Sequence, residues 1–272
     1  MNIVDAIIIA IVEGLTEFLP ISSTGHMVIT SSLLGIAESD FTKLFEVSIQ
    51  LGAILAVVLL YWRKFFDFSR WQFYVKLIVG VIPALVLGFL FNDKIDKLLE
   101  SPTTVAISTL VGGIILLFVD NLFKKPAVEK DSEISYTKSF IIGCWQVIAM
   151  IPGVSRSAAS IIGGMQQKLT RSLAAEFSFF LAVPTMFAAT AYSIVLKKWT
   201  GSGVEKKGYQ LIMENHDNTI AFIIGNVVAF VVAILAIKFF ISYLQKHGFR
   251  LFGWYRIIVG IIVLILIFSG RL

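Results

Sequence analysis

The chain has 272 residues, of which 57% are hydrophobic and 15% charged, and its mean hydropathy is +0.85. A soluble domain carries roughly 25% charged residues, so this composition excludes a soluble protein and indicates a polytopic membrane protein. The net charge of +5 comes from loop lysines and arginines without a basic run, which argues against nucleic acid as a partner. The single cysteine, Cys144, excludes an intrachain disulfide and a thiolate metal site.

The first predicted element, residues 3–36, is too long to be one spanning helix. As a straight helix it would run about 50 Å, whereas the hydrocarbon core of a bilayer is about 30 Å thick. A proline and several hydroxyl groups interrupt its centre in the segment LPISSTGH (19–26). We therefore predict a re-entrant hairpin of two half-helices, whose irregular loop must be surrounded by protein or water. One long kinked helix is the alternative.

A second interrupted region and six simple spans follow along the chain. Residues 138–165 are broken by IPGVSRSAAS (151–160) and predict a second re-entrant hairpin. Within the fourth span, Pro184 should kink the helix. The stretches apolar and long enough to span a bilayer are 43–62, 73–92, 104–122, 172–196, 218–245 and 250–269.

The two interrupted regions belong to an internal repeat. Aligning Pro20 with Pro152 places Ser23 on Ser155, and EVSIQLGA downstream then matches EFSFFLAV. Each half therefore contains one hairpin and three spanning helices. Because three crossings are an odd number, the second copy must be inverted relative to the first.

The predicted fold class is thus an all-α polytopic membrane protein with an inverted-topology repeat. It forms a single integral domain over 1–272, with repeats at 1–122 and 138–272 joined by the linker 123–137. The four loops on one side of this topology hold 10 Lys and Arg, against 8 on the other side. The positive-inside rule then places these four loops in the cytoplasm and both termini outside. These loops are 63–72, 123–137, 166–171 and 246–250.

The repeat separates residues that hold the fold from residues that act on a ligand. Glu46 and Glu176 occupy matching positions, so we expect them to accept hydrogen bonds from free N–H groups of the hairpins. Ionisable residues present in one half only are candidates for function, because they are costly within a membrane. These residues are Glu13, Glu17 and His26 in the first hairpin and Arg156 in the second.

Glu13 and Glu17 are four residues apart and lie on one face of the first half-helix. Two like charges at this spacing cost energy unless a cation lies between them or one is protonated. Oxygen ligands of this kind suit Mg²⁺ or Ca²⁺ bound together with a substrate phosphate. General acid or base catalysis by one of them is a competing role, and a polar seam between helices is the structural alternative.

The hairpin loops have the features of anion-binding sites. Each half-helix that follows a loop offers unpaired N–H groups and the positive end of its dipole. Ser22, Ser23 and Thr24 add hydroxyl groups, and Arg156 can bind phosphate with two donors. For any of these serines, and above all for Ser22, a helix N-cap is the structural alternative.

His26 is the one histidine inside an apolar segment, three residues after Ser23. It could deprotonate Ser23, protonate a leaving oxygen or attack phosphorus itself, or it could be an ordinary core residue. Together with the carboxylates, hydroxyls and guanidinium, it completes a set of groups suited to phosphoryl transfer. Because these groups lie within apolar segments, a lipid phosphate ester or anhydride is the favoured substrate.

The segments EGLTEFLPISSTGH (13–26) and PGVSRSAASIIGGM (152–165) resemble the signatures of the undecaprenyl-pyrophosphate phosphatase family, also called the bacitracin-resistance family. The resemblance covers the full length. Many members read G-A-T where this chain has Ala158, Ala159 and Ser160, a departure that leaves the site residues in place. Matching residues are Glu13, Glu17, Ser23, Thr24 and His26 in the first segment and Pro152, Gly153, Ser155, Arg156 and Ser157 in the second.

The resemblance implies a multi-pass protein of the bacterial cytoplasmic membrane that removes the terminal phosphate of a C55 isoprenyl diphosphate. The product would be the carrier lipid for peptidoglycan synthesis, and loss of the diphosphate would relieve sequestration by bacitracin. The family is described as using a divalent cation at a site open to the periplasm. Ser23 corresponds to the proposed nucleophile and His26 to the essential histidine, and His26 as nucleophile is the close variant. Ser155 is expected to cap its helix, with phosphate contact as a further role.

A lipid-phosphate transporter is the alternative from another class, because inverted repeats with broken helices are a transporter architecture. The reactive cluster in one half argues against pure transport, since transport requires no nucleophile beside a base. The glycine pairs Gly112–Gly113 and Gly163–Gly164 could pack helices internally or between the subunits of a homodimer.

Overall fold

The computed structural model describes residues 1–91, 98, 101–200 and 205–269, and these are overwhelmingly helical. The described residues also contain one small sheet, the two-stranded antiparallel hairpin β1–β2. The described elements are α1 (Ile3–Thr16), α2 (Ser23–Leu33), α3 (Asp40–Ser48), α4 (Gln50–Leu60), α5 (Trp62–Phe65), α6 (Trp71–Leu90), α8 (Pro102–Leu122), η1 (Asp131–Glu133), α9 (Tyr136–Ile148), α10 (Arg156–Gln166), α11 (Arg171–Ala191), η2 (Tyr192–Leu196), β1 (Lys198–Trp199), β2 (Lys206–Lys207), α12 (Gly208–Ile212), α13 (His216–His247) and α14 (Arg250–Phe268).

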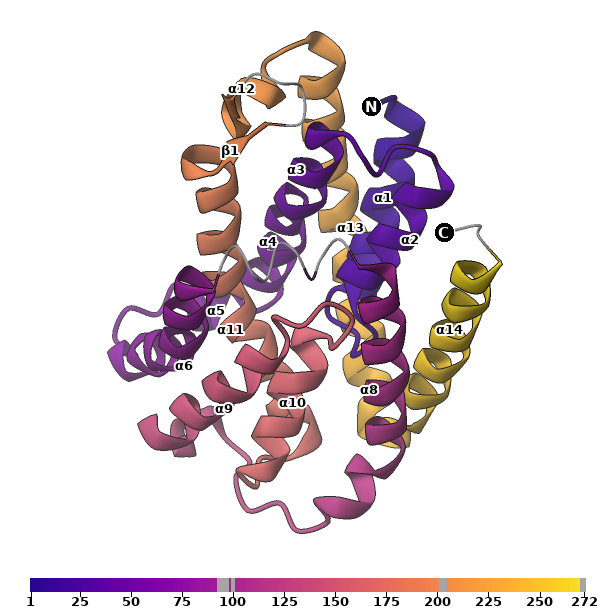
Figure 1. Ribbon diagram of the computed structural model, residues 1–272. Coiled ribbons are helices and arrows are strands. Elements are labelled where there is room, and N and C mark those ends of the chain that lie inside the picture. The colour runs from indigo at the N-terminus through magenta and orange to yellow at the C-terminus, as the bar shows by residue number, and fades with distance from the viewer. Residues whose placement is uncertain (92–97, 99–100, 201–204, 270–272) are drawn as a thin grey trace.

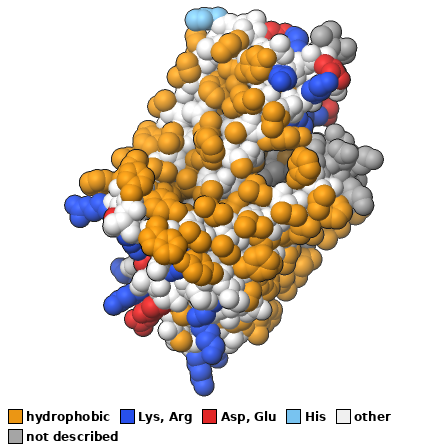
Figure 2. All heavy atoms as spheres, turned by 90° about the vertical axis from the view of Figure 1, so that its left-hand side faces the viewer, with side chains coloured by type: hydrophobic (Ala, Val, Ile, Leu, Met, Phe, Trp, Pro, Cys, Tyr) orange, Lys and Arg blue, Asp and Glu red, His pale blue; other side chains and the backbone are white. Residues whose placement is uncertain are grey.

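Six helical stretches are long and apolar enough to cross a membrane, and they confirm the six predicted spans. The first combines α3 and α4, which meet at a turn at Ile49, and the fourth combines α11 with η2. On the face shown in Figure 2, hydrophobic side chains form a broad belt, and charged side chains gather toward its two ends. This surface is typical of a multi-pass membrane protein. Residue 92, much of the expected loop 93–103, residues 201–204 and residues 270–272 lie outside the described residues.

Both interrupted regions form two helices joined by a loop, so the alternative of one long kinked helix is wrong. In the first region α1 packs against α2, and in the second α9 packs against α10. Figure 1 shows the α1–α2 hairpin in the upper half of the molecule and the α9–α10 hairpin in the lower half. Their loops approach each other in the middle.

Many of the helix contacts join the first half of the chain to the second. Helix α1 packs on α13 and α4 packs on α13, whereas α9 packs on α6 and α11 packs on α6. The third spanning helices, α8 and α14, pack on each other, and so do the first ones, α4 and α11. The first helix of each hairpin therefore packs on a spanning helix of the opposite half, whereas α10 packs on α11 of its own half.

The loops that the charge count assigns to one side do meet at one end of the molecule. Arg70 Nη2 forms an ion pair with Asp131 Oδ2 at 2.8 Å, which joins the loop before α6 to the linker. Val128 forms a β-bridge with Leu169, and Asp120 binds both Arg171 and the backbone N–H of Phe249. The N-terminus and the end of α14 lie toward the other end, in the upper half of Figure 1.

Helix α11 lies in the centre of the core, where Phe179, Phe180 and Leu181 have no exposed surface. The glycine pairs pack internally. A Cβ at Gly113 would lie 2.8 Å from the carbonyl oxygen of Gly253, and one at Gly163 would lie 2.7 Å from the ring of Trp145. These glycines thus allow close helix contacts within one chain.

The expectation for the two matching glutamates is wrong. Glu176 forms an ion pair with Lys64 at 3.3 Å, and Glu46 Oε1 is buried without a hydrogen-bond partner among the described residues. Neither carboxylate accepts a hydrogen bond from a hairpin N–H in the described part of the chain, because the hairpin loops use their own serines as caps.

Candidate active site

The two hairpin loops end in the same unusual backbone conformation. Ser22, with φ +73°, caps α2, and its Oγ accepts a hydrogen bond from the N–H of Gly25 at 3.4 Å. Ser155, with φ +76°, caps α10 and accepts from the N–H of Ala158 at 3.2 Å. Positive φ is uncommon for residues other than glycine and costs energy, and such strain concentrates at functional sites.

These caps correct the predicted register of the repeat beyond the loops. Ser22, rather than Ser23, is structurally equivalent to Ser155, so Ser23 and Arg156 are the first residues of the two half-helices. The second loop is one residue longer than the first, and an alignment through the prolines therefore slips by one residue at the helix starts. The hydroxyl of Ser23 and the guanidinium of Arg156 thus occupy equivalent positions.

Glu17 joins these two groups. It follows α1 as the C-cap residue, and its Oε2 accepts a hydrogen bond from Ser23 Oγ. Its Oε1 accepts from Arg156 Nη2 at 3.0 Å, in an ion pair whose side chains are 13% (Arg156) and 6% (Glu17) exposed. The predicted convergence of the hairpins is therefore present, and Glu17 is the carboxylate at its centre.

Arg156 is held in place by α11 and keeps one donor free. Its Nη1 donates to the backbone carbonyl of Ser178 at 2.9 Å. Its Nε is buried and has no acceptor among the described residues. A phosphate oxygen would satisfy this donor, since guanidinium groups bind phosphate through paired N–H groups.

Glu13 lies one turn before Glu17 on α1 and is completely buried. Neither of its oxygens has a hydrogen-bond partner in the described chain other than the neighbouring carboxyl group of Glu17. Both carboxylates lie at the C-terminal end of α1, where the helix dipole disfavours negative charge. The two residues lie on one face, as the sequence predicted, and Arg156 pairs with Glu17 while Glu13 has no ion-pair partner among the described residues.

His26 does not form the expected contact with Ser23. Its Nδ1 lies 2.7 Å from the carbonyl oxygen of Ser22, so this nitrogen is the donor, and its Nε2 lies 2.8 Å from the hydroxyl of Tyr255. The two rings also stack with their centres 5.6 Å apart. Both nitrogens are therefore occupied, and the base in contact with Ser23 is Glu17.

A cavity of about 210 Å³ lies between the hairpin loops, α4 and α11. It contains most of the predicted phosphate-binding residues, whereas Glu13, His26 and Ser157 do not line it. The lining residues are Glu17, Ser22, Ser23, Thr24, Gln50, Ala149, Met150, Pro152, Gly153, Ser155, Arg156, Thr185, Met186 and Ala189.

Two other predicted residues have structural contacts. The hydroxyl of Ser157 is buried and donates to the carbonyl oxygen of Phe18 at 2.8 Å, so it ties the second hairpin to the first. Gly153 has φ +90°, and an added Cβ would also collide with the backbone of Val105. Only glycine fits this position.

Sequence reasoning missed two polar residues of the cavity. Gln50 is the first residue of α4, after the turn at Ile49, and Thr185 follows Pro184 in α11. A glutamine within an apolar span is a signal that was available in the sequence. Its approach to the loops was not, because it depends on the packing of α4.

Tyr255 and Arg256, adjacent on α14, were also missed. Tyr255 is the partner of His26, and the completely buried Arg256 donates to backbone carbonyls of both hairpin loops. An arginine within the predicted span 250–269 was the available signal, since charged residues in spans are costly.

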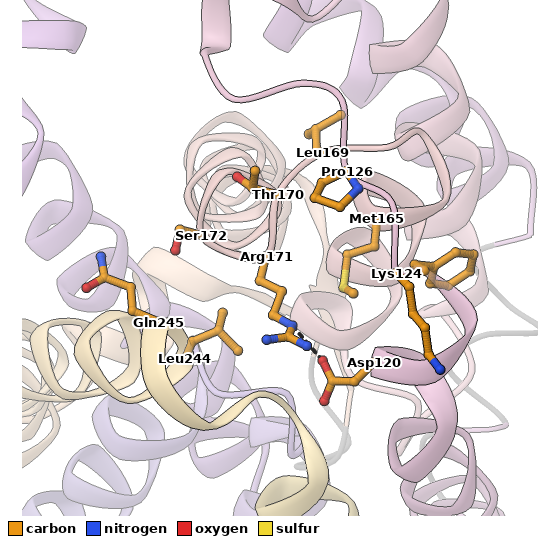
Figure 3. A pocket seen from close by; sticks show the side chains of 11 residues that line it. Asp120, Lys124, Pro126, Met165, Leu169, Thr170, Arg171, Ser172, Leu244 and Gln245 are labelled. Carbon is orange, nitrogen blue, oxygen red and sulfur yellow. Dashed lines mark ion pairs between the residues drawn. The ribbon is translucent and has the colours of Figure 1, made fainter.

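A larger cavity of about 410 Å³ lies away from this site, at the end of the molecule where the loops meet. Figure 3 shows the Arg171 side chain at its centre, directed toward Asp120, and the ion pair between them measures 2.7 Å. Asp120 also accepts from the N–H of Phe249, just before α14. None of the predicted site residues lines this cavity, and its contacts anchor the start of α14.

Glu13 and Glu17 carry the oxygen ligands that a hard divalent cation prefers, although only Glu17 of the two lines the smaller cavity. Both oxygens of Glu13 are buried, and among the described residues their one hydrogen-bonding neighbour is the carboxyl group of Glu17. The described residues contain no group of three or more His, Cys, Asp or Glu side chains that could hold a metal. Mg²⁺ typically binds through one or two carboxylates, water and substrate phosphate, so two glutamates suffice.

Comparison with known proteins finds close relatives over the whole chain. The sequence model described as bacitracin resistance protein BacA matches residues 6–262. The undecaprenyl-diphosphatase of Flavobacterium psychrophilum is 60% identical over 268 residues, covering 98% of this chain and 97% of the relative. The enzyme of the same name from Flavobacterium johnsoniae is 58% identical over 269 residues, with coverages of 98% and 97%. That from Bdellovibrio bacteriovorus is 47% identical over 273 residues, with coverages of 100% and 98%.

Proposed function

The chain belongs to the family of the bacitracin resistance protein BacA, and from this premise we infer that it is a membrane phosphatase acting on undecaprenyl diphosphate. It hydrolyses the terminal phosphate to give undecaprenyl phosphate. In the cell this reaction recycles the carrier lipid of peptidoglycan synthesis, and it gives bacitracin resistance by removing the diphosphate that the antibiotic binds.

The observation that carries the catalytic part of this proposal is the contact of Ser23 and Arg156 with the same carboxylate, Glu17. A hydroxyl paired with a base, beside a guanidinium, is the arrangement of an activated nucleophile at a phosphate site. The starts of α2 and α10 open onto the same cavity, so their first-turn N–H groups favour an anion there.

In the first step, Ser23 Oγ attacks the terminal phosphorus while Glu17 accepts the hydroxyl proton. An Oγ–phosphorus bond forms, and the bond from that phosphorus to the bridging oxygen breaks, which releases undecaprenyl phosphate. Arg156 and the helix N–H groups stabilise the charge on the phosphoryl oxygens.

In the second step, water attacks the phosphoserine. Glu17 returns its proton to Ser23 Oγ as the phosphorus–Oγ bond breaks, and the water proton passes to the departing phosphate. His26 takes a positioning role, because its Nδ1–H holds the carbonyl of Ser22 and its Nε2 is bonded to Tyr255. These contacts disfavour His26 as the nucleophile.

Glu13 and Glu17 would hold the divalent cation, Mg²⁺ or Ca²⁺. A bound cation would supply charge neutralisation for the diphosphate and for the paired carboxylates. Its presence would explain why Glu13, which is fully buried and forms no ion pair among the described residues, lies at the negative end of α1.

The size of the cavity indicates how the lipid binds. The cavity measures about 210 Å³. It accommodates the phosphate groups and not a long prenyl chain, which would lie along the lipid-facing helices. Thr24, Ser155 and Gly153 line the cavity that would hold the phosphate groups.

We propose that the hairpins are re-entrant and belong to an inverted repeat in the bacterial cytoplasmic membrane, with the site open to the periplasm and both termini outside. The helix contacts that join the two halves and the matched caps at Ser22 and Ser155 support this arrangement. Lysine and arginine in the clustered loops support the orientation.

Acid quenching of a reaction with substrate labelled in its terminal phosphate tests the proposal. Detergent-purified protein should release labelled phosphate from a long-chain prenyl diphosphate, and a chelator should stop the release. Quenching should trap an acid-stable label on the protein that is absent from Ser23→Ala. A label that survives an alkaline quench but not an acid quench, and that is lost in His26→Ala, would move the nucleophile to His26. Substrate binding without any phosphate release would instead favour a transporter.

A further inference from the structure

Arg256 is the largest fully buried side chain of the described protein, and no carboxylate lies within ion-pair distance of it there. Its guanidinium instead donates to backbone carbonyl oxygens of three separate segments. These are Thr109 (3.1 Å) from Nε, Pro20 (3.1 Å) and Val154 (2.9 Å) from Nη1, and Ser108 (3.2 Å) and Gly153 (2.7 Å) from Nη2.

A buried charge without a counter-ion is costly, so these contacts must repay a large desolvation penalty. Pro20 belongs to the first hairpin loop, Gly153 and Val154 to the second, and the remaining carbonyls to α8. Gly112 gives the guanidinium room, because a Cβ there would lie 2.7 Å from its central carbon. Arg256 is therefore the one described side chain bonded to both loops and to α8 at once.

The hydrogen bond from Arg256 to the carbonyl of Val154 determines the direction of the N–H group of Ser155, which belongs to the same peptide unit. A peptide unit is planar with its C=O and N–H opposed. With the Val154 carbonyl turned to Arg256, the N–H of Ser155 points away from Arg256. Ser155 lines the phosphate cavity, whereas Arg256 does not. A hydrogen bond to a cation also polarises this peptide and makes its N–H a better donor.

We propose that Arg256 is a positioning residue for the phosphatase reaction: from behind the two loops it holds their backbone so that the N–H groups at the starts of α2 and α10 face one phosphate. It touches neither substrate nor nucleophile and acts through the loops. This inference rests on the proposed phosphatase function and adds to it a residue outside both signature segments.

Two variants test the role from opposite directions. Arg256→Lys keeps the charge but replaces a planar fork of donors by a single ammonium group, which cannot reach all five carbonyls. Gly112→Ala keeps Arg256 and pushes its guanidinium away from the loops. Matched controls are Arg250→Lys at the exposed start of α14 and Ile115→Ala on the exposed face of α8.

The readouts are kcat and KM for phosphate release from a long-chain prenyl diphosphate, per molecule of folded protein, together with the thermal unfolding midpoint. We expect kcat to fall roughly 100-fold in Arg256→Lys, as for loss of a transition-state donor, with KM within about threefold of wild type. Gly112→Ala should lose about tenfold in kcat, and both controls should retain wild-type values. A purely structural residue would reduce the yield of folded protein and leave kcat per folded molecule unchanged.

Wild-type kcat in folded Arg256→Lys, or a change in KM alone, would overturn the proposal. If Arg256→Lys does not fold, Gly112→Ala decides by the same criterion, and failure of both to fold would make Arg256 a folding residue. Absence of phosphate release from the wild type and both controls would instead overturn the proposed function.

Discussion

The two hairpins have closely similar backbones and opposite chemistry. Each contains a helix, a short loop and a second helix capped by a serine at positive φ. The α1–α2 hairpin ends its first helix with Glu17 and begins its second with Ser23, whereas α9–α10 has Ala149 and Arg156 at these positions. The first hairpin thus contributes a carboxylate bonded to a hydroxyl, and the second contributes a guanidinium.

This division explains why neither hairpin can form the site alone. Glu17 bonds Ser23 within its own hairpin and Arg156 across to the other. Removing either hairpin would leave a buried charge unpaired, which is costly in a membrane. The repeated backbone gives each hairpin a helix start suited to binding an anion. Different residues at matching positions, such as Ser23 and Arg156, then give the two hairpins different functional groups.

The largest expected effect on kcat is the difference between replacing Ser23, the proposed nucleophile, and replacing Ser155, which caps α10. Ser23→Ala should lower kcat by at least about a thousandfold, because it removes the nucleophile. Ser155→Ala should lower kcat by about tenfold or less and cost about 1 kcal/mol of stability through the lost cap. Phosphate-release kinetics measure both, with the exposed Cys144→Ala as control. Equal losses in the two serine variants would contradict the assigned difference between the hairpins.

The next effect distinguishes the two carboxylates of the first hairpin. Glu17→Gln should lower kcat by roughly 10²–10⁴-fold, because it removes the base from Ser23. Glu13→Gln should raise the Mg²⁺ concentration needed for half-maximal activity by about tenfold or more, because it removes a ligand for the cation. Metal titrations of activity check both, with the exposed Glu38→Gln as control. An unchanged metal requirement in Glu13→Gln would remove Glu13 from the cation site.

A smaller effect concerns the orientation of His26, which has no counterpart in the second hairpin. Tyr255→Phe removes the hydroxyl bonded to His26 Nε2 and should lower kcat by about threefold to tenfold, as for a single positioning hydrogen bond. The exposed Tyr209→Phe is the matched control. A loss in Tyr255→Phe as large as that in Ser23→Ala would show that His26 takes part in bond breaking.

The smallest effect probes the direct bond between the hairpins. Ser157→Ala leaves the carbonyl of Phe18 without this donor and should destabilise the protein by about 1 kcal/mol, which lowers the thermal midpoint by a few degrees. Its effect on kcat should stay within about threefold, because the hydroxyl lies outside the cavity. Thermal unfolding in detergent, with the exposed Ser132→Ala for comparison, measures the shift. A large loss of kcat at unchanged stability would place Ser157 in the phosphate site.

The sequence alone identified the parts whose signals are local. Hydropathy located the six spans, and chain length with a central proline located both hairpins. The spacing of Glu13, Glu17 and Ser23 and the single arginine of the second hairpin indicated which groups converge. The relative positions of Glu13 and Glu17 follow from backbone geometry within one half-helix, whereas the contact of Arg156 with Glu17 depends on packing between the hairpins.

Packing between distant segments decided the rest. Pro20 and Arg256 are 236 residues apart, and His26 turns to Tyr255, 229 residues away, instead of to Ser23 three residues away. The register of the second half-helix depends on one additional loop residue, which a proline alignment does not detect. Buried donors must find acceptors wherever the fold brings them, so the partners of His26 and Arg256 follow from the contacts of α14 with the loops and not from any local pattern.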